Sequence, residues 1–563
     1  MKTKQIFSNQ QTESKLRIIP LGGTTGVTKN MYVYEYYYQN DLQDIIIVDC
    51  GIGFPKEQNL GVDLVIPDIT YLKNKTKYIR AILLTHGHED HISALPYHYA
   101  DLGKPPIFAT KLTKQFLENK FAEFGNRVHI NEIDYKKTYE FGVFQAEYIH
   151  LTHSIPDTAH IFIKTPAGNI YHGSDFKFDL TPPYESPPDF AKIIKAGQQN
   201  ILCLLTDCLG VEREGMTLSE KAVGETFIEE MRKTKGKFFM TTFSSNISRI
   251  RQCMDAAAIF NRKVVFVGRS MKENTKLARD LGYLPLYQKL VIKEDEAVKL
   301  PPNKLCIIVA GSQGQFDSAL SKISQKRNPN ISIQSGDKII FSSDPIPGNE
   351  DQIYSLIETL SELQADVVYS NIQDQLHASG HGNQDDLKIL VRLTNPKFIM
   401  PIGGTLRHQY VYQKFAKDLG YGKDKIIMLK EGETIWFENK NAYKGERIET
   451  KNIYVDAESI GDVGNTVLQD RKTLAEEGFV NVILLLNNNN QLVSKPQMIT
   501  RGFVFTPNEK RLFTKAEQEI EKILKNPNKD YNLIRKEIDK ALTKLFMQEK
   551  GRSPLIVISI LNI

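Results

Sequence analysis

Residues 81–91 read AILLTHGHEDH, and this stretch determines how the rest of the chain is interpreted. AILLT has the character of a buried strand and leads directly into three histidines and an aspartate, after which a helix is predicted. The chain has 12 histidines, so three within six residues is a concentration that calls for a reason. Imidazole and carboxylate groups are ligands of Zn²⁺, and a loop allows four side chains to converge on two ions. A polar loop with incidental histidines is the alternative interpretation.

The composition is ordinary for a soluble globular protein, with 41% hydrophobic and 25% charged residues among 563. No apolar run approaches the ~20 residues that span a bilayer, and the start of the chain lacks the apolar stretch of a secretory signal. The five cysteines show no CxxC spacing, which suits a reducing compartment. We therefore expect a cytoplasmic protein with no membrane segment. The net charge of +5 is a weak indication of a polyanionic partner.

Short β-branched runs alternate with helix-like stretches over most of the chain, which is the pattern of an α/β protein. Residues 208–370 hold their own alternation, enough for a second domain. A lysine-rich stretch at 438–452 is interpreted as a linker. In the small α+β unit that follows, residues 514–517 (TKAE) are predicted to be a capping box that opens a helix. Buried strands are predicted at 45–49, 81–85, 201–206, 264–267, 306–310, 338–343 and 398–401.

One loop cannot complete a metal site, so further ligands must come from elsewhere in the chain. His153 lies in the polar stretch HSIPD, and Asp175 follows the strand-like stretch AGNIYH. Asp49 ends the strand IIIVD, where its carboxylate could orient a ligand histidine through a hydrogen bond. Each of these residues alone could be a buried structural group. Their order after the histidine cluster favours a site.

The order of Asp49, the histidine cluster, His153 and Asp175 along the chain resembles the successive motifs of the metallo-β-lactamase fold. The surrounding sequence resembles one branch of that fold, bacterial ribonuclease J of the β-CASP group. The resemblance covers almost the whole chain, from about residue 16 to 505. The matching stretches are GVDLVIPDITYL (61–72), LLTHGHEDHISALPY (83–97), THSIPD (152–157), SDFKFD (174–179), VGRSM (267–271), GSQG (311–314), PIPGNE (345–350), HASGHG (377–382) and RGFVF (501–505).

The resemblance implies an α/β architecture with three domains. A metallo-β-lactamase αββα sandwich would be interrupted by an inserted β-CASP α/β domain and followed by a small C-terminal α+β domain. The expected boundaries are 1–207 for the first part of the sandwich, 208–370 for the insertion, 371–445 for the completing part, and 446–563 for the linker and C-terminal domain.

By the same resemblance, six side chains would hold two Zn²⁺ ions, with Mn²⁺ as an alternative metal. Two ions ~3.5–4 Å apart generate hydroxide and clamp the oxygens of a phosphodiester. The carboxylate of Asp90 would also position the attacking water. Three histidines would hold one ion, an aspartate and a histidine the other, and a second aspartate would bridge them: His86, His88 and His153; Asp90 and His91; and Asp175.

A second segment, HASGH, resembles the part of the family that grips the substrate phosphate beside the metals. Its residues are His377, Ala378, Ser379, Gly380 and His381. Gly380 allows the backbone to come close, Ser379 offers a hydroxyl, and His381 can donate a proton or a hydrogen bond to developing charge. A glycine-rich turn that carries two histidines is the alternative interpretation.

The sequence departs from the family pattern close to this predicted site. Gly403 lies in PIGGT (401–405), where the family usually has the histidine of PVHGE, so one ligand of the second zinc is absent. Three protein ligands and a water remain a legitimate catalytic coordination, at reduced affinity. His408 is interpreted as a surface histidine. Asp207 resembles the acidic residue of the first β-CASP motif and, like Asp49, is expected to orient other groups.

The resemblance implies a zinc-dependent ribonuclease that takes part in the maturation and decay of mRNA and rRNA. Family members act as 5′→3′ exonucleases on RNA with a 5′-monophosphate, and also as endonucleases. Because the departures gather near one site, the alternative is a weakly active or inactive RNA-binding subunit that partners an active paralogue. Family members assemble through the C-terminal domain, so a homodimer or a hetero-oligomer with a paralogue is expected. A small-molecule hydrolase is disfavoured because the extra domains would have no role.

Overall fold

The described part of the chain divides into two compact units, which are considered separately. The computed structural model describes residues 13–56, 59–286, 289–343, 345–346, 348–369, 378–457, 459–461, 463–487, 489, 491–504, 509–525 and 530–563. One unit comprises Met1–Gly53 and Ile66–Asn452, and the other comprises Phe54–Val65 and Ile453–Ile563. Among the described residues, no helix is both long enough and apolar enough to cross a bilayer.

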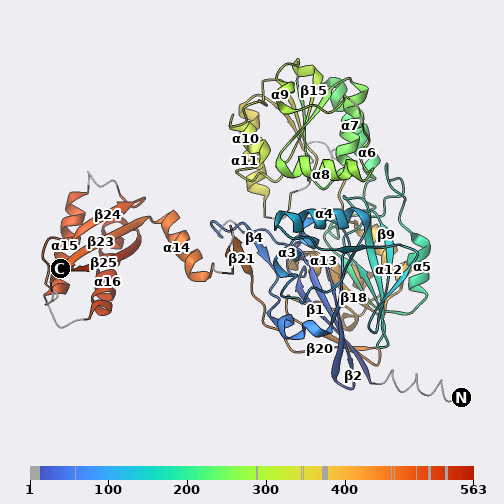
Figure 1. Cartoon of the computed structure of the whole chain (residues 1–563), viewed down its shortest axis with the longest axis horizontal. Coiled ribbons are helices and arrows are strands. Elements are labelled where there is room, and N and C mark those ends of the chain that lie inside the picture. The colour runs from blue at the N-terminus through green and yellow to red at the C-terminus, as the bar shows by residue number, and fades with distance from the viewer. Residues whose placement is uncertain are drawn as a thin grey trace. The chain divides into compact units, whose positions relative to one another are not determined.

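Two mixed sheets face each other in the first unit (Figure 1). The eight-stranded sheet contains, in spatial order, β20 (Asn441–Lys444), β19 (Ile435–Glu438), β1 (Ser14–Gly22), β2 (Met31–Tyr38), β3 (Asp41–Val48), β5 (Ile79–Leu83), β6 (Ile107–Ala109) and β7 (Ile130–Glu132). The six-stranded sheet contains β18 (Phe398–Ile402), β12 (Ile201–Asp207), β11 (Asn169–Gly173), β10 (Thr158–Lys164), β9 (Phe144–Leu151) and β8 (Thr138–Phe141).

Apolar side chains from both sheets meet in one core, because each strand turns its apolar face inward. Helices α5 (Phe190–Gly197), α12 (Gln384–Thr394) and α13 (Leu406–Asp418) cover the outer face of the six-stranded sheet. The 3₁₀ helix η1 (Thr70–Tyr78) and α4 (Lys111–Glu123) pack against the eight-stranded sheet. The order of layers is helix, sheet, sheet, helix, and the predicted αββα sandwich is confirmed.

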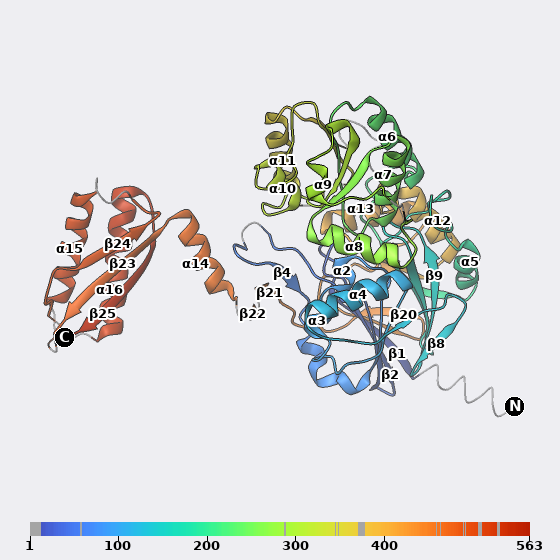
Figure 2. The same ribbon diagram turned by 45° about the horizontal axis from the view of Figure 1, so that its top comes forward.

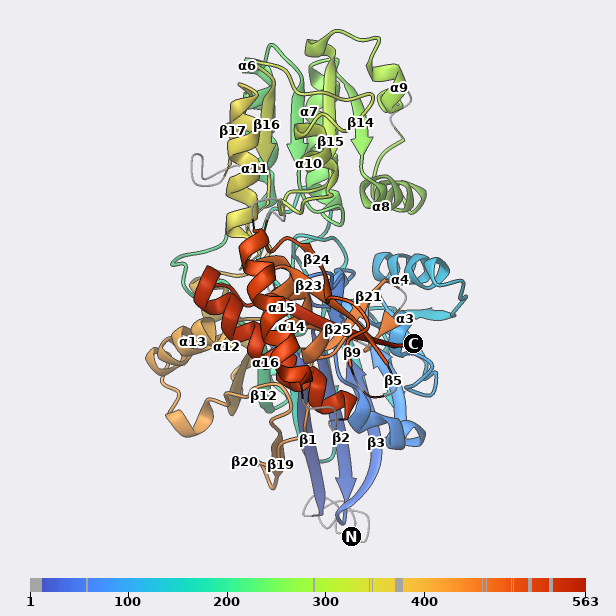
Figure 3. The ribbon, with the colours of Figure 1, turned by 90° about the vertical axis from the view of Figure 1, so that its left-hand side faces the viewer.

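An α/β domain is inserted between β12 and β18. Figure 3 shows its parallel strands side by side: β14 (Lys263–Val267), β15 (Leu305–Val309), β13 (Phe238–Thr241), β16 (Lys338–Phe341) and β17 (Asp366–Val368). Its helices are α6 (Glu220–Lys233), α7 (Ile247–Ile259), α8 (Arg269–Asp280), α9 (Glu294–Ala297), α10 (Ala319–Ser324) and α11 (Glu350–Glu362).

Helices cover both faces of this inserted sheet, as parallel sheets require. Helices α10 and α11 pack on the face that carries Ile307 and Val309. Helix α7 packs on the opposite face, where Cys253 lies 3.6 Å from Cys306, sulfur to sulfur. Helices α8 and α4 lie side by side where the insertion meets the sandwich (Figure 2).

The second unit has a three-stranded sheet in the order β24 (Gln497–Arg501), β23 (Phe479–Leu486) and β25 (Leu555–Asn562). Helices α15 (Lys510–Leu524) and α16 (Tyr531–Lys550) bury one face of it. The unit also contains the hairpin of β21 (Ile453–Asp456) and β22 (Ser459–Ile460), and α14 (Asn465–Glu476).

The seven predicted buried strands are confirmed. Their ends agree with the prediction within two residues, except that β3 begins four residues earlier, at Asp41. Two local predictions are wrong. Thr514 does not open a helix, because α15 begins at Lys510 and the Thr514 hydroxyl donates to the Lys510 carbonyl at 2.9 Å from inside the helix. The stretch 438–452 is not all linker, because β20 pairs with β19 at the edge of the large sheet.

Candidate metal centre

Both sheets of the sandwich contribute residues to one site at the ends of their strands. Asp49 follows β3, the histidine loop follows β5, and His153 lies just beyond β9. Asp175 follows β11, and Asp207 is the last residue of β12. Because the ends of these strands meet at one edge, residues far apart in sequence come together there, as in other α/β proteins.

Three histidine nitrogens converge on one point. His88 Nδ1 lies 3.1 Å from His86 Nε2 and 3.2 Å from His153 Nε2. A zinc ion with tetrahedral bonds of ~2.0–2.1 Å would separate its ligand atoms by about 3.3 Å. The three nitrogens are therefore already at a zinc-like spacing.

The other nitrogen of each ring fixes which nitrogen carries the proton. His153 Nδ1 donates to the Gly380 carbonyl at 2.6 Å, and His88 Nε2 lies 3.4 Å from the Ser154 hydroxyl. His86 Nδ1 lies 3.1 Å from the Thr85 hydroxyl, which itself donates to Asp49 at 2.8 Å and so accepts from the ring. In His86 and His153 the converging nitrogen is thus left with a free lone pair, as a metal ligand must be.

Burial keeps these rings neutral. It lowers the pKa of His86 and of His88 well below the ordinary value, and it lowers the pKa of His153 to about 3. Neighbouring histidines act in the same direction. Neutral imidazoles are the form that binds a metal.

The carboxylate of Asp175 lies between this histidine group and His91. Its Oδ2 is 4.0 Å from His86 Nε2, 3.9 Å from His153 Nε2 and 3.4 Å from His91 Nε2. Burial opposes its ionisation, but His91 and the other nearby rings outweigh burial and hold the pKa of Asp175 well below its ordinary value. The structure thus brings this carboxylate within 4.0 Å of nitrogens on both sides.

Asp49 holds His91 in place. It adopts φ +59° at the end of β3, and its carboxylate accepts the Thr85 backbone N–H at 2.9 Å. The same carboxylate accepts His91 Nδ1–H at 2.8 Å, which turns His91 Nε2 toward Asp175. Burial alone would lower the pKa of His91, but the carboxylates of Asp90, Asp175 and Asp49 raise it well above its ordinary value. This part of the site therefore favours a positive charge.

Asp90, a predicted metal ligand, lies outside the closest groups of ligand atoms. Its Oδ2 lies 3.7 Å from His91 Nε2, and burial raises its pKa to about 6. Within the described residues, the groups whose ligand atoms all lie within 4.8 Å of one another do not include Asp90. They are His86, His88 and His153; His86, His91 and Asp175; and His153, Asp175 and His381.

Asn30 reaches the same region and was not predicted from the sequence. Its Nδ2 lies 3.1 Å from His91 Nε2, 3.4 Å from Asp90 Oδ2 and 3.2 Å from the Val27 carbonyl. An asparagine before a strand carries no signal of such a role. The same is true of Ser154, which orients His88.

Residues 378–382, which we call the strap, cross over the histidine group. The Gly380 carbonyl accepts from His153, as described above, and a Cβ at position 380 would stand 2.7 Å from His153 Cε1. Only glycine fits here, because carbon atoms normally approach to ~3.5 Å. Ser379 Oγ accepts the His381 N–H at 3.1 Å within the strap. The predicted residue His377 lies outside the described residues.

The half-buried His381 and the buried Asp207 form an ion pair beside the histidines. His381 Nδ1 lies 2.7 Å from Asp207 Oδ2, and its ring centroid is 5.1 Å from that of His153. Burial would lower the pKa of His381, but Asp207 and Asp175 outweigh burial and raise it to about 9. A protonated His381 can donate a hydrogen bond to an anion at this place.

Gly403 lies at the edge of the site, after β18. A Cβ at this position would be 3.4 Å from Asp175 Oδ1 and 3.5 Å from Asp207 Oδ1, so a side chain there would point at the centre. The interpretation of His408 as a surface histidine is wrong. His408 is buried, its Nδ1 lies 3.0 Å from the Thr405 hydroxyl at the start of α13, and its Nε2 lies 3.6 Å from Glu212.

The donor set around His88 fits a divalent metal. Three unprotonated imidazole nitrogens and one carboxylate are a donor set of catalytic zinc sites. The set around His91 fits less well, because it offers one imidazole and Asp175, a more distant Asp90, and no side chain at position 403.

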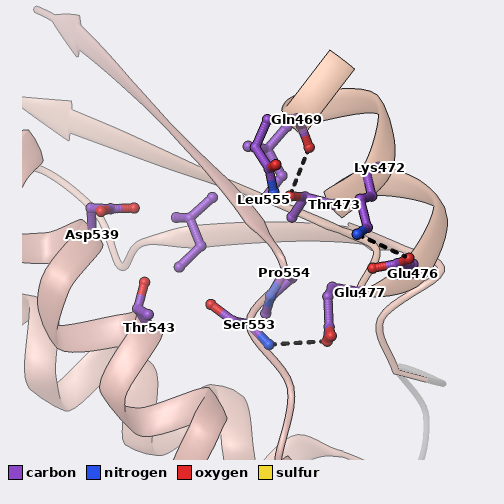
Figure 4. Close-up of a pocket in the computed structure, with 11 residues that line it drawn as sticks. Gln469, Lys472, Thr473, Glu476, Glu477, Asp539, Thr543, Ser553, Pro554 and Leu555 are labelled. Atoms are coloured by element: carbon purple, nitrogen blue, oxygen red, sulfur yellow. Dashed lines mark hydrogen bonds and ion pairs between the residues drawn. The ribbon is translucent and has the colours of Figure 1, made fainter. Parts of the chain in front are cut away.

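A hollow of about 470 Å³ in the second unit has a different character (Figure 4). It lies between α14, α16 and the start of β25, and no histidine or cysteine lines it. Some of its polar groups pair with one another, namely Lys472 with Glu476 and the Ser553 N–H with Glu477. We assign it no chemistry.

Family models match three parts of the chain. A beta-lactamase superfamily domain matches residues 45–225, the ribonuclease J beta-CASP domain matches 235–360, and the ribonuclease J C-terminal domain matches 466–563. With the sandwich, its insertion and the histidine–aspartate site, these matches define the class: a metallo-β-lactamase fold protein of the β-CASP group.

The chain belongs to the ribonuclease J family. It is 34% identical to Ribonuclease J2 of Bacillus subtilis (strain 168) over 99% of this chain and 100% of that protein. It is 35% identical to Ribonuclease J of Thermus thermophilus over 97% and 95% of the two chains, and 32% identical to Ribonuclease J 1 of Streptococcus pyogenes over 98% of each. A solved structure of a protein of unknown function from Enterococcus faecalis V583 shares the fold over 75% of this chain and 100% of that one, with TM-score 0.52 and 17% identity.

Proposed function

We propose that the chain is a zinc-dependent ribonuclease that degrades RNA from a 5′-monophosphate end and can also cut internally, in the maturation and decay of mRNA and rRNA. Its family makes it a hydrolase of RNA phosphodiester bonds. The observation that carries the proposal is the convergence of ring nitrogens from His86, His88 and His153 on one point beside Asp175. We take the predicted boundaries of the sandwich, insertion and C-terminal domain as part of the proposal.

The chemistry divides between metal and protein. When bound, divalent ions neutralise charge on the phosphate and lower the pKa of water. Asp90 would position the attacking water, as the family resemblance implies. His381, held protonated by Asp207, would donate a hydrogen bond to the phosphate, and the strap would hold the substrate beside it.

The metal set is part of the proposal. His86, His88 and His153 would hold one Zn²⁺, and Asp90 and His91 would hold a second, with Asp175 between them. Mn²⁺ is an alternative at the second position, because carboxylate ligands suit it. The absent side chain at Gly403 lowers the affinity expected there.

Gly403 also supports a second candidate function. A chain that lacks one ligand of the second metal could serve as a weakly active or inactive RNA-binding subunit of an active paralogue. This candidate requires a hetero-oligomer, whereas the ribonuclease can act as a homodimer. Both would work in the cytoplasm, as the cysteine pattern predicts.

Cleavage of matched RNA substrates tests the proposal. The purified chain is assayed on one RNA that carries a 5′-monophosphate or a 5′-triphosphate, and the bound metal is measured on the same sample. We expect bound zinc, preference for the monophosphate, and loss of cleavage in Asp90→Ala. Bound zinc without cleavage, in conditions where another ribonuclease J cleaves, would refute the enzyme and support the subunit.

A further inference from the structure

Arg249, at the start of α7, is the largest fully buried side chain among the residues that the structure describes. Its guanidinium donates to both carboxylate oxygens of Glu220, at 2.7 and 2.9 Å from Nη2 and 3.3 Å from Nε. Lys177, also fully buried, donates to Glu220 at 2.9 Å from the other side. Burial opposes ionisation of Glu220, but the charges of Arg249 and Lys177 outweigh burial and lower its pKa to about 2. The three residues form a buried ionised triad.

The triad connects the insertion to the loops of the metal centre. Glu220 and Arg249 belong to the inserted helices α6 and α7, whereas Lys177 lies two residues after Asp175 in the sandwich. The Lys177 N–H donates to the Thr152 carbonyl at 2.8 Å, and the Thr152 hydroxyl donates to the Lys177 carbonyl at 2.6 Å. Thr152 directly precedes His153. The ligand loops and the triad are therefore joined by short hydrogen bonds.

Arg249 also binds the strap. Its Nη2 donates to the Ala378 carbonyl at 2.8 Å, and its Nη1 donates to the Ser342 carbonyl after β16 at 2.7 Å. Two residues beyond Ala378, the Gly380 carbonyl fixes His153. One planar group thus joins α6, the end of β16 and the strap at the junction of the two domains.

Stability alone is a poor reason for this arrangement. Desolvating an ion costs several kcal/mol, and apolar replacements of buried ion groups are often neutral or stabilising. A guanidinium instead offers five donors in a fixed fork, so it can set the relative position of several backbone segments. That geometry matters here because the Gly380 carbonyl of the strap accepts a hydrogen bond from His153, a predicted metal ligand.

We propose that Arg249 is a positioning residue for the metal centre, which keeps the Gly380 carbonyl and His381 of the strap in register with His153. The inference rests on the proposed function, because it assigns Arg249 a part in holding a metal ligand. Arg249 touches neither metal nor substrate and acts through Ala378.

The test compares two variants with a matched control in the full-length protein. Arg249→Met removes the fork, and Arg249→Lys keeps a charge for Glu220 but cannot reach three segments at once. The control is Arg262→Met, because Arg262 is also buried but donates to the carbonyls of Gly236, Thr234 and Leu305 inside the insertion. Zinc affinity is measured by chelator competition, with Tm, kcat and KM on the same samples.

Both Arg249 variants should bind zinc about 10- to 100-fold more weakly and lose a similar factor in kcat, the usual effect of removing a partner that orients a ligand. KM should rise as well, because the strap would also hold the substrate, so zinc affinity is the readout that separates an effect on the metal centre from an effect on substrate binding. Arg262→Met should lower Tm and leave zinc affinity and kcat unchanged.

A folded Arg249→Lys with wild-type zinc affinity and kcat would overturn the proposal, and this variant decides the matter if Arg249→Met does not fold. A loss of Tm alone, as in the control, would also overturn it. If the wild type cleaves no RNA, the proposed function fails, while the zinc affinities still decide the role of Arg249.

Discussion

Replacing Gly380 with alanine should weaken metal binding while the chain stays folded. The added Cβ would stand 2.7 Å from His153 Cε1 and 2.9 Å from both His153 Nδ1 and Ser154 Cβ. Since carbon atoms pack at ~3.5 Å, the ring must retreat by about 0.8 Å. Ligand distances in metal sites are held within about 0.2 Å, so this shift removes His153 from good coordination.

The expected loss is about 10- to 100-fold in zinc affinity, or about 1.4–2.7 kcal/mol. Chelator competition gives the affinity, and far-UV circular dichroism with a thermal melt shows whether the protein is folded. The control is Gly464→Ala in the second unit, where nothing lies within 4 Å of the added Cβ. If Gly380→Ala binds zinc as tightly as this control, the strap does not orient His153 and the reasoning is wrong.

Two further predictions concern the second metal position and the buried triad. Gly403→His should raise the amount of metal bound per chain, because the new side chain would point at Asp175. It should lower the free energy of unfolding of the metal-free protein by about 1–2 kcal/mol, because φ at this position is +66°. Elemental analysis measures the metal content and urea unfolding measures the stability, and an unchanged metal content would contradict the geometry. Glu220, whose pKa falls from 4.5 to about 2, should contribute about 3 kcal/mol of stability that is fully present above pH 4.5 and lost as the pH falls toward 2. The stability gap between wild type and Glu220→Gln should therefore narrow on acidification, and a gap that stays constant from pH 5 to 3 would count against the triad.

The strands and the candidate metal ligands were predictable because each is recognised from residues that are neighbours in the sequence. The run IIIV before Asp49 and AILL before Thr85 are apolar and β-branched or aliphatic, which is the pattern of strands buried on both faces. The errors also have local causes. TKAE resembles a capping box, but Leu512 packs into the core of this unit and α15 begins at Lys510, five residues before the start that the box predicts. Residues 441–444 are polar because β20 is an edge strand, whose side chains face water.

Residue type and order along the chain are enough to predict the α/β class and the family resemblance, and through that resemblance the six candidate ligands. Which nitrogen of each histidine faces the centre could be read only from the tertiary structure, since Asp49, Ser154 and the Gly380 carbonyl come from different segments. The tertiary structure also brought Asn30 to His91 and joined Arg249 to the strap across 129 residues of sequence. A hydrogen bond from a side chain to the backbone carbonyl of a distant segment leaves no pattern in the sequence, because any residue supplies a carbonyl.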